Sequence, residues 1–223
     1  NFEAGSFSET TTASFSVDFG VGAVDGKGVT NSVTASSTTR DEGLQAVYGF
    51  QIDLNTSFTG EDSLDISIDA GNGSSTGALA EFDLNGYGDT AGNADKLVVD
   101  GVSYTFPVGD ATAFIGDNTD GSMLFTTACV YGGPSNTLDD CGNVTAGITG
   151  GGVSMGAAYD FGNGFSTAAG AQFTETGIAT LENADSYAFN AAYSGDNYGV
   201  SLIYAVVETG SQNDTYTALN GYY

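Results

Sequence analysis

Apolar and polar residues alternate in short segments along most of this chain, and this alternation limits the folds that it can adopt. Residues 15–21 read FSVDFGV, and residues 198–206 read YGVSLIYAV. A period of two residues is typical of β-strands that have one apolar and one polar face. The polar positions are mostly Ser, Gly, Asn, Gln and Asp, and aromatic residues lie near the segment ends. The pattern therefore favours a transmembrane β-barrel, whose strands turn apolar side chains to lipid and polar side chains to a water-filled lumen.

The alternating segments predict ten strands, and the connectors between them alternate between long and short. The predicted strands are 12–24, 43–57, 62–70, 97–107, 111–117, 152–161, 165–174, 185–194, 197–207 and 214–222. The short connectors carry Gly with Asp or Asn, residues that supply the backbone conformations of tight hairpin turns. This alternation is expected of an all-β, antiparallel, up-and-down barrel with tight turns at one end and long loops at the other.

The phase of the alternation also predicts which acids face the lumen. Asp18, Asp53, Asp65, Asp69 and Asp160 fall at polar positions of their strands. A register shift of one residue would point all five side chains towards the hydrocarbon of the membrane, so the phase of the alternation is tightly specified.

The third long connector, between the fifth and sixth predicted strands, is the expected constriction. In general porins the third loop folds into the barrel and narrows the pore. We therefore predict that Asp117, Asp120, Asp139 and Asp140 line the constriction and set selectivity. The alternative is that these residues stabilise turns on an exposed loop, where Asp is common.

The same connector holds both cysteines of the chain, Cys129 and Cys141. Their spacing does not fit a metal or redox motif, and the chain has no His to complete a zinc site. We expect a local disulfide formed in an oxidising compartment, which would stabilise the fold by about 3 kcal/mol in the chain-entropy model. The alternative is two reduced, unrelated thiols.

Charge excludes some classes of function. The chain has 3 basic and 28 acidic residues, a net charge of −25, so it is not expected to bind nucleic acid. Without His, nucleophile–base pairs of the Ser-His or Cys-His kind cannot form. We expect no enzymatic activity, no cofactor and no metal site; residues 117–121 (DNTDG) lack the ligand spacing of a calcium loop. Because no row of basic residues opposes the acids, a channel built from this chain should prefer cations.

Four stretches resemble the outer-membrane porins of marine cyanobacteria, a carbohydrate-porin-like family often called iron-uptake porins. They are ETTTASFSVDFGVGAVDG (9–26), SFTGEDSLDISIDAGN (57–72), VDGVSYTFPVGD (99–110) and CVYGGPSNTLDDCGNV (129–144). The resemblance implies a barrel of about sixteen strands and an N-terminal cell-wall-tethering module. Residues 1–223 are thus expected to form an outer-membrane barrel domain without that module, as part of a larger barrel. The alternative is a smaller closed barrel, which the terminal Tyr222 and Tyr223 favour.

The resulting functional prediction is a passive diffusion channel for small ions and polar solutes, embedded in outer-membrane lipid and possibly homotrimeric. The alternative is a secreted or surface-layer structural β-protein, whose acidic surface would suit a saline environment. That alternative explains the acidity and the missing His, but accounts poorly for the connector lengths and the placement of aromatic residues.

Overall fold

The computed structural model consists of strands and turns over the residues that it describes. These are 10–23, 29–30, 37–38, 43–73, 79, 95–129, 148, 151–178, 185–208 and 213–223. The strands are β1 (Thr11–Gly22), β2 (Val29–Thr30), β3 (Ser37–Thr38), β4 (Gln45–Thr56), β5 (Ser63–Gly71), β6 (Val98–Val108), β7 (Ala111–Asp117), β8 (Val153–Asp160), β9 (Phe165–Phe173), β10 (Ser186–Ser194), β11 (Gly199–Glu208) and β12 (Asn213–Tyr222).

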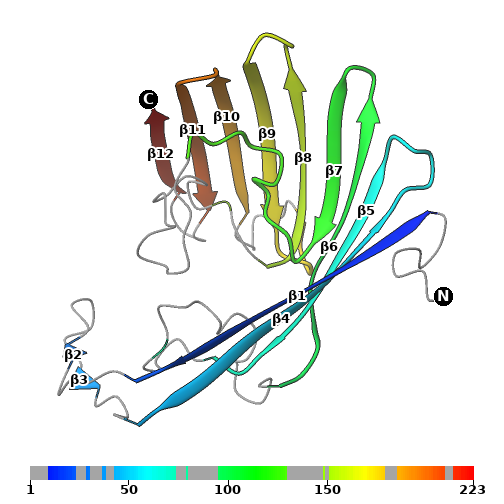
Figure 1. The fold of residues 1–223 in the computed structure, drawn as a ribbon. Helices are drawn as coiled ribbons and strands as arrows, with labels where there is room; N and C mark the ends of the chain where they lie inside the picture. Colours follow the sequence, from blue (N-terminus) through cyan, green and yellow to red (C-terminus); the bar gives the residue numbers. More distant parts are fainter. Residues whose placement is uncertain are drawn as a thin grey trace.

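Ten of these strands form one antiparallel, up-and-down sheet. Its order is β1-β4-β5-β6-β7-β8-β9-β10-β11-β12. Apart from the separate β2–β3 hairpin, neighbouring strands in the sheet are therefore consecutive along the chain. Figure 1 shows β5 to β12 side by side in a curved sheet, while β1 and β4 form a long pair that crosses its lower end. The ten predicted strands and their up-and-down order are confirmed, with bounds that differ by at most two residues.

Two features differ from the expectation or go beyond it. The small hairpin of β2 and β3 lies within the first long connector, where no strand was predicted. In addition, the sheet is open, because no pairing between described residues joins β1 to β12. A closed barrel is therefore not established by the structure.

Register explains why the sheet has two distinct faces. In β1 and β4, Phe15 pairs with Ile52 on one face, and Ser14 pairs with Asp53 on the other. The same phase continues to β11, where Leu202 and Ser201 point to opposite faces. We call the face of Phe15 the apolar face and the face of Asp53 the polar face.

The short turn between β4 and β5 is organised by one buried carboxylate. Asp62 accepts hydrogen bonds from the backbone N–H groups of Phe58 (3.0 Å) and Thr59 (2.8 Å) and from the hydroxyls of Ser57 (2.9 Å) and Thr59 (2.7 Å). The hydroxyl of Tyr104, on β6, donates a further bond of 2.6 Å. Asp62 thus links residues of the turn to one another and links the turn to β6, the next strand along the sheet.

These bonds predict a pH dependence of stability. The hydrogen bond from Tyr104, followed by those from Thr59 and Ser57, holds the pKa of Asp62 well below its usual range. Because the folded-state pKa lies below the unfolded value of about 3.9, the stabilisation is present above that value and is lost as the pH falls below it. We expect Asp62→Asn to be less stable than the wild type at pH 7, and the difference to shrink towards pH 2. Urea unfolding across this pH range measures it, with the exposed Glu61→Gln as control; an unchanged difference at low pH would contradict the prediction.

Candidate functional site

The polar face carries its acids mainly on β1, β4 and β5. Asp18, Asp53, Asp65 and Asp69 share this face by register, and Asp160 joins it at the short-turn end of β8. Asp53 accepts hydrogen bonds from Gln51 Nε2 (2.7 Å), Ser67 Oγ (2.7 Å) and Ser14 Oγ (3.4 Å), all on the same face. The five acids therefore share the polar face, and two hydroxyls and an amide orient Asp53; that this face lines a lumen stays a prediction.

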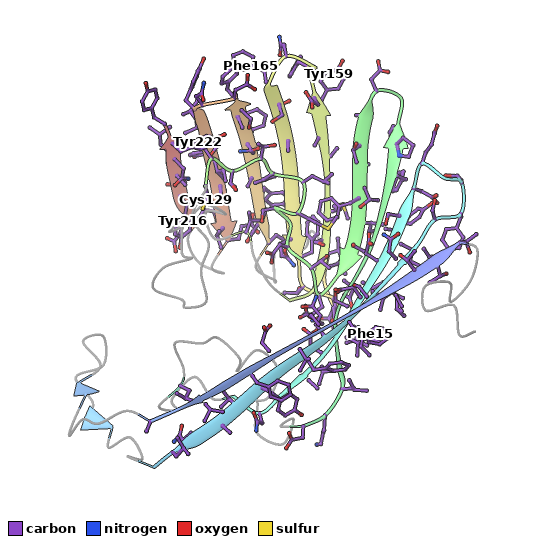
Figure 2. All side chains as sticks on the ribbon, viewed as in Figure 1. Phe15, Cys129, Tyr159, Phe165, Tyr216 and Tyr222 are labelled. Carbon is purple, nitrogen blue, oxygen red and sulfur yellow. The ribbon has the colours of Figure 1, made fainter. Side chains whose placement is uncertain are left out.

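A segment that follows β7 lies across the polar face of the second half of the sheet. We call residues 118–129 the cross-face segment. Figure 1 shows it as a green trace that runs from the end of β7 in front of β8, β9 and β10 towards β11, and in Figure 2 its last residue, Cys129, lies over β11. A position on the polar face is what the predicted constriction loop requires.

The first attachment of the segment is a glutamine on β9. Gln172 Oε1 accepts a bond of 2.7 Å from the backbone N–H of Gly121. Its amide nitrogen donates to the carbonyls of Thr119 and Gly151, at 3.1 Å each. Gln172 therefore satisfies backbone groups of the segment that would otherwise be buried without partners.

The second and third attachments lie on β10 and β11. Asn190, fully buried, accepts a bond from Thr126 N–H (2.9 Å) and donates one to Thr126 C=O (3.0 Å), as a neighbouring strand would. Ser201 Oγ accepts a bond from Ala128 N–H (2.9 Å). β9, β10 and β11 thus all contribute polar side chains that hold the segment. Ser166 of β9 and Ser154 of β8 add side-chain hydrogen bonds to Thr126 and Thr119.

Small residues and one apolar cluster allow the segment to lie close to the sheet. A Cβ atom on Gly170 of β9 would overlap the carbonyl oxygen of Gly121. Ile148 is fully buried against Ala188, Ile203 and Ala205, with Phe125 of the segment packed against this cluster. Backbone contact and apolar burial therefore add to the hydrogen bonds.

An acidic cavity lies at the start of the segment. It has a volume of about 510 Å³ and is lined by Asp65 of β5, Asp100 of β6 and Asp120 of the segment, together with Ser67, Ser103 and Thr119. The polar faces of β9, β10 and β11 carry amides, hydroxyls, small residues and aliphatic residues such as Ile203 within their bounds, not carboxylates. The carboxylates of the polar face therefore lie on strands other than β9, β10 and β11, which hold most of the segment.

The predicted constriction residues have different positions. Asp120 lines the cavity, whereas Asp117 pairs with Val102 and Val153 in the phase of the apolar face. Asp139, Asp140 and Cys141 lie outside the described residues, so their roles and the Cys129–Cys141 bridge stay predictions.

Sequence reasoning missed Gln172, Asn190, Ser201 and Asp100. The first three stand at polar positions within predicted strands, so the alternation already assigned them to the polar face. Nothing in the sequence marks them as partners of a segment more than fifty residues earlier. Asp100 is the extra residue at a register shift between β5 and β6, which alternation cannot reveal.

The apolar face has aromatic residues at both ends of the strands. At the short turns, the ring centroids are 4.7 Å apart for Phe165 and Tyr193 and 4.8 Å apart for Tyr159 and Phe161. At the long-connector end, Phe173 packs against Tyr187 at 5.8 Å. Figure 2 shows Tyr159 and Phe165 beside one short turn, with Tyr222 at the same end of the sheet.

Many apolar side chains on this face are open to the surroundings. The exposed fraction is 77% for Phe19, 68% for Phe15 and 51% for Phe189. Phe165 and Phe173, at the two ends of β9, are separated by eight residues, or about 26 Å of extended chain. Phe173 itself is buried, but Tyr187, Phe189 and Leu202 continue the exposed apolar surface on the neighbouring strands. Large exposed apolar patches are unusual in soluble monomers, and aromatic belts at two levels are typical of membrane-spanning strands.

Comparison with known proteins gave no match, either to a protein-family model or to a curated protein. None of the described residues forms a helix of the length and apolarity that crossing a membrane requires.

Proposed function

We propose that the chain forms the wall of an outer-membrane porin, a passive and non-enzymatic diffusion channel for small ions and polar solutes that prefers cations. The observation that carries this proposal is the two-sided sheet. Its apolar face has aromatic belts at both strand ends, and its polar face has acids and a firmly attached segment. A soluble structural protein has no need for the exposed aromatic belts.

The proposal requires closure of the sheet. Unpaired strand edges are not tolerated in hydrocarbon, so the free edges of β1 and β12 must be paired in the membrane. Closure between them, or pairing with further strands in a barrel of about sixteen strands, meets this requirement. β1 and β12 run antiparallel in an up-and-down sheet of ten strands, so direct pairing would continue the antiparallel pattern.

The cross-face segment would act as the constriction of this channel. It lies on the polar face, and its attachments include side chains of β8, β9, β10 and β11. A Cys129–Cys141 disulfide would fix the connector just beyond the last attachment, on Ser201. Cations would pass between the segment and the acids of β1, β4 and β5.

Planar-bilayer recording of the detergent-purified protein tests the proposal. We expect discrete conductance steps and, under a salt gradient, a reversal potential of the sign that cation preference gives. A protein that stays soluble without detergent and gives no conductance would overturn the proposal and favour the surface-layer structural alternative.

A further inference from the structure

One buried carboxylate at the long-connector end of the sheet has an oxygen without a partner. Asp185 directly precedes β10 and is only 2% exposed. Its Oδ2 lies 3.4 Å from the hydroxyl of Tyr187, which donates to it, but no described group makes a hydrogen bond to its Oδ1. The described residues 185–208 and 213–223 contain no Lys or Arg. Buried charges in proteins are generally paired or bound to metal ions, so this carboxylate needs a partner.

A second carboxylate lies directly across from the first. The backbone N–H of Glu208, the last residue of β11, donates to the carbonyl of Asp185 at 2.8 Å. Side chains that oppose each other in this way point to the same face and have Cβ atoms about 4.5–5.5 Å apart. Both carboxylates also interact electrostatically with the hydroxyl of Tyr187. Like charges in this arrangement repel each other unless a cation lies between them.

The next strand adds a third oxygen donor to the same row. Asn213, the first residue of β12, is the register partner of Glu208. Carboxylate, amide and carbonyl oxygens are the ligands that Ca²⁺ takes in proteins, with water completing its six to eight positions. No three His, Cys, Asp or Glu side chains among the described residues are placed to hold one metal ion together, so a site here rests on two carboxylates and an amide.

We propose that Asp185, Glu208 and Asn213 bind a Ca²⁺ ion at the long-connector end of β10, β11 and β12. The ion would neutralise the two carboxylates and occupy the free Oδ1 of Asp185. It would also connect the ends of three neighbouring strands. Ca²⁺ fits better than Mg²⁺, because Mg²⁺ requires a near-octahedral shell and keeps several of its waters. The site rests on the register of three strands and holds whether or not the sheet lines a pore.

Terbium luminescence offers a direct test, because Tb³⁺ replaces Ca²⁺ and tyrosine transfers excitation energy to a nearby bound Tb³⁺. We expect tyrosine-sensitised Tb³⁺ emission from the full chain in detergent, displaced by Ca²⁺ at lower concentration than by Mg²⁺. Asp185→Asn should weaken Tb³⁺ binding by about tenfold or more, since ligand charge sets affinity at such sites. Tyr187→Phe should lower the emission per bound ion, because it removes the tyrosine nearest to the proposed site.

Asp196→Asn is the matched control, because it removes one exposed carboxylate from the short turn at the other end of the same hairpin. It should leave both affinity and emission as in the wild type. Ca²⁺ should also raise the melting temperature of the wild type and not that of Asp185→Asn. Equal Tb³⁺ affinities for the wild type, Asp185→Asn and Asp196→Asn would overturn the proposal, as would the absence of tyrosine-sensitised emission.

Discussion

Replacing both Gln172 and Asn190 by alanine is expected to raise the single-channel conductance, because these side chains hold the cross-face segment against the sheet. Each substitution leaves a backbone N–H of the segment, that of Gly121 or Thr126, without its partner. A buried polar group that loses its partner costs about 1–3 kcal/mol. Since about 1.4 kcal/mol corresponds to a factor of ten, the population with a detached segment should rise by one to two orders of magnitude per site.

The measurement is single-channel recording of the double variant in a planar bilayer. We expect a larger mean conductance, more open-channel noise and faster proteolysis of the segment near Phe125. Asn220→Ala is the matched control, because Asn220 lies on the polar face of β12 and the structure shows no hydrogen-bond partner for its Nδ2. A double variant that folds and inserts but conducts as the wild type does would show that the segment does not limit the pore.

Neutralising the acids of the cavity is expected to remove most of the cation preference that we propose for the channel. In water, one carboxylate stabilises a cation about 4 Å away by ~1 kcal/mol. Asp65, Asp100 and Asp120 line one cavity, so together they should raise the local cation concentration roughly tenfold or more at low salt. The triple Asp→Asn variant should therefore bring the reversal potential under a potassium chloride gradient close to zero.

Asp117→Asn is the control for this experiment. Asp117 directly precedes the cross-face segment but pairs with Val102 and Val153 in the phase of the apolar face. We expect it to leave the reversal potential unchanged, although it removes the same charge. A shift in Asp117→Asn as large as in Asp120→Asn would contradict the assignment of selectivity to the cavity. Higher salt should reduce the effect of the triple variant, because mobile ions screen the carboxylates.

The strands and their faces were largely predictable, because local chemistry specifies both. Alternation such as FSVDFGV places Phe15 and Asp18 on opposite faces, and the register confirms it. Glycine with Asn or Asp in the short connectors specified the hairpins, and Gly109 and Gly162 have the positive φ that such turns need. These signals act within a few residues of one another, and a single sequence contains them.

The site was predictable only in part, because it depends on contacts between residues far apart in the chain. The third long connector was expected to lie inside the sheet, and residues 118–129 do lie on the polar face. Which side chains hold it was not predictable, because Asn190 on a predicted strand looks like any other amide at a polar position. The face of Asp117 was not predicted although the bounds of β7 were, because the adjacent Phe114 and Ile115 are both apolar and leave the phase of this strand ambiguous.

The order of the strands has a consequence for how the molecule folds. Every strand of the sheet pairs with a chain neighbour, so the hairpins can form in succession with little loop-closure entropy. The cross-face segment is the exception, because its bonds to Gln172, Asn190 and Ser201 span 51, 64 and 73 residues. Its docking must wait until β9, β10 and β11 have assembled. The polar face of the folding sheet therefore stays uncovered until the last step, in which the segment docks onto it.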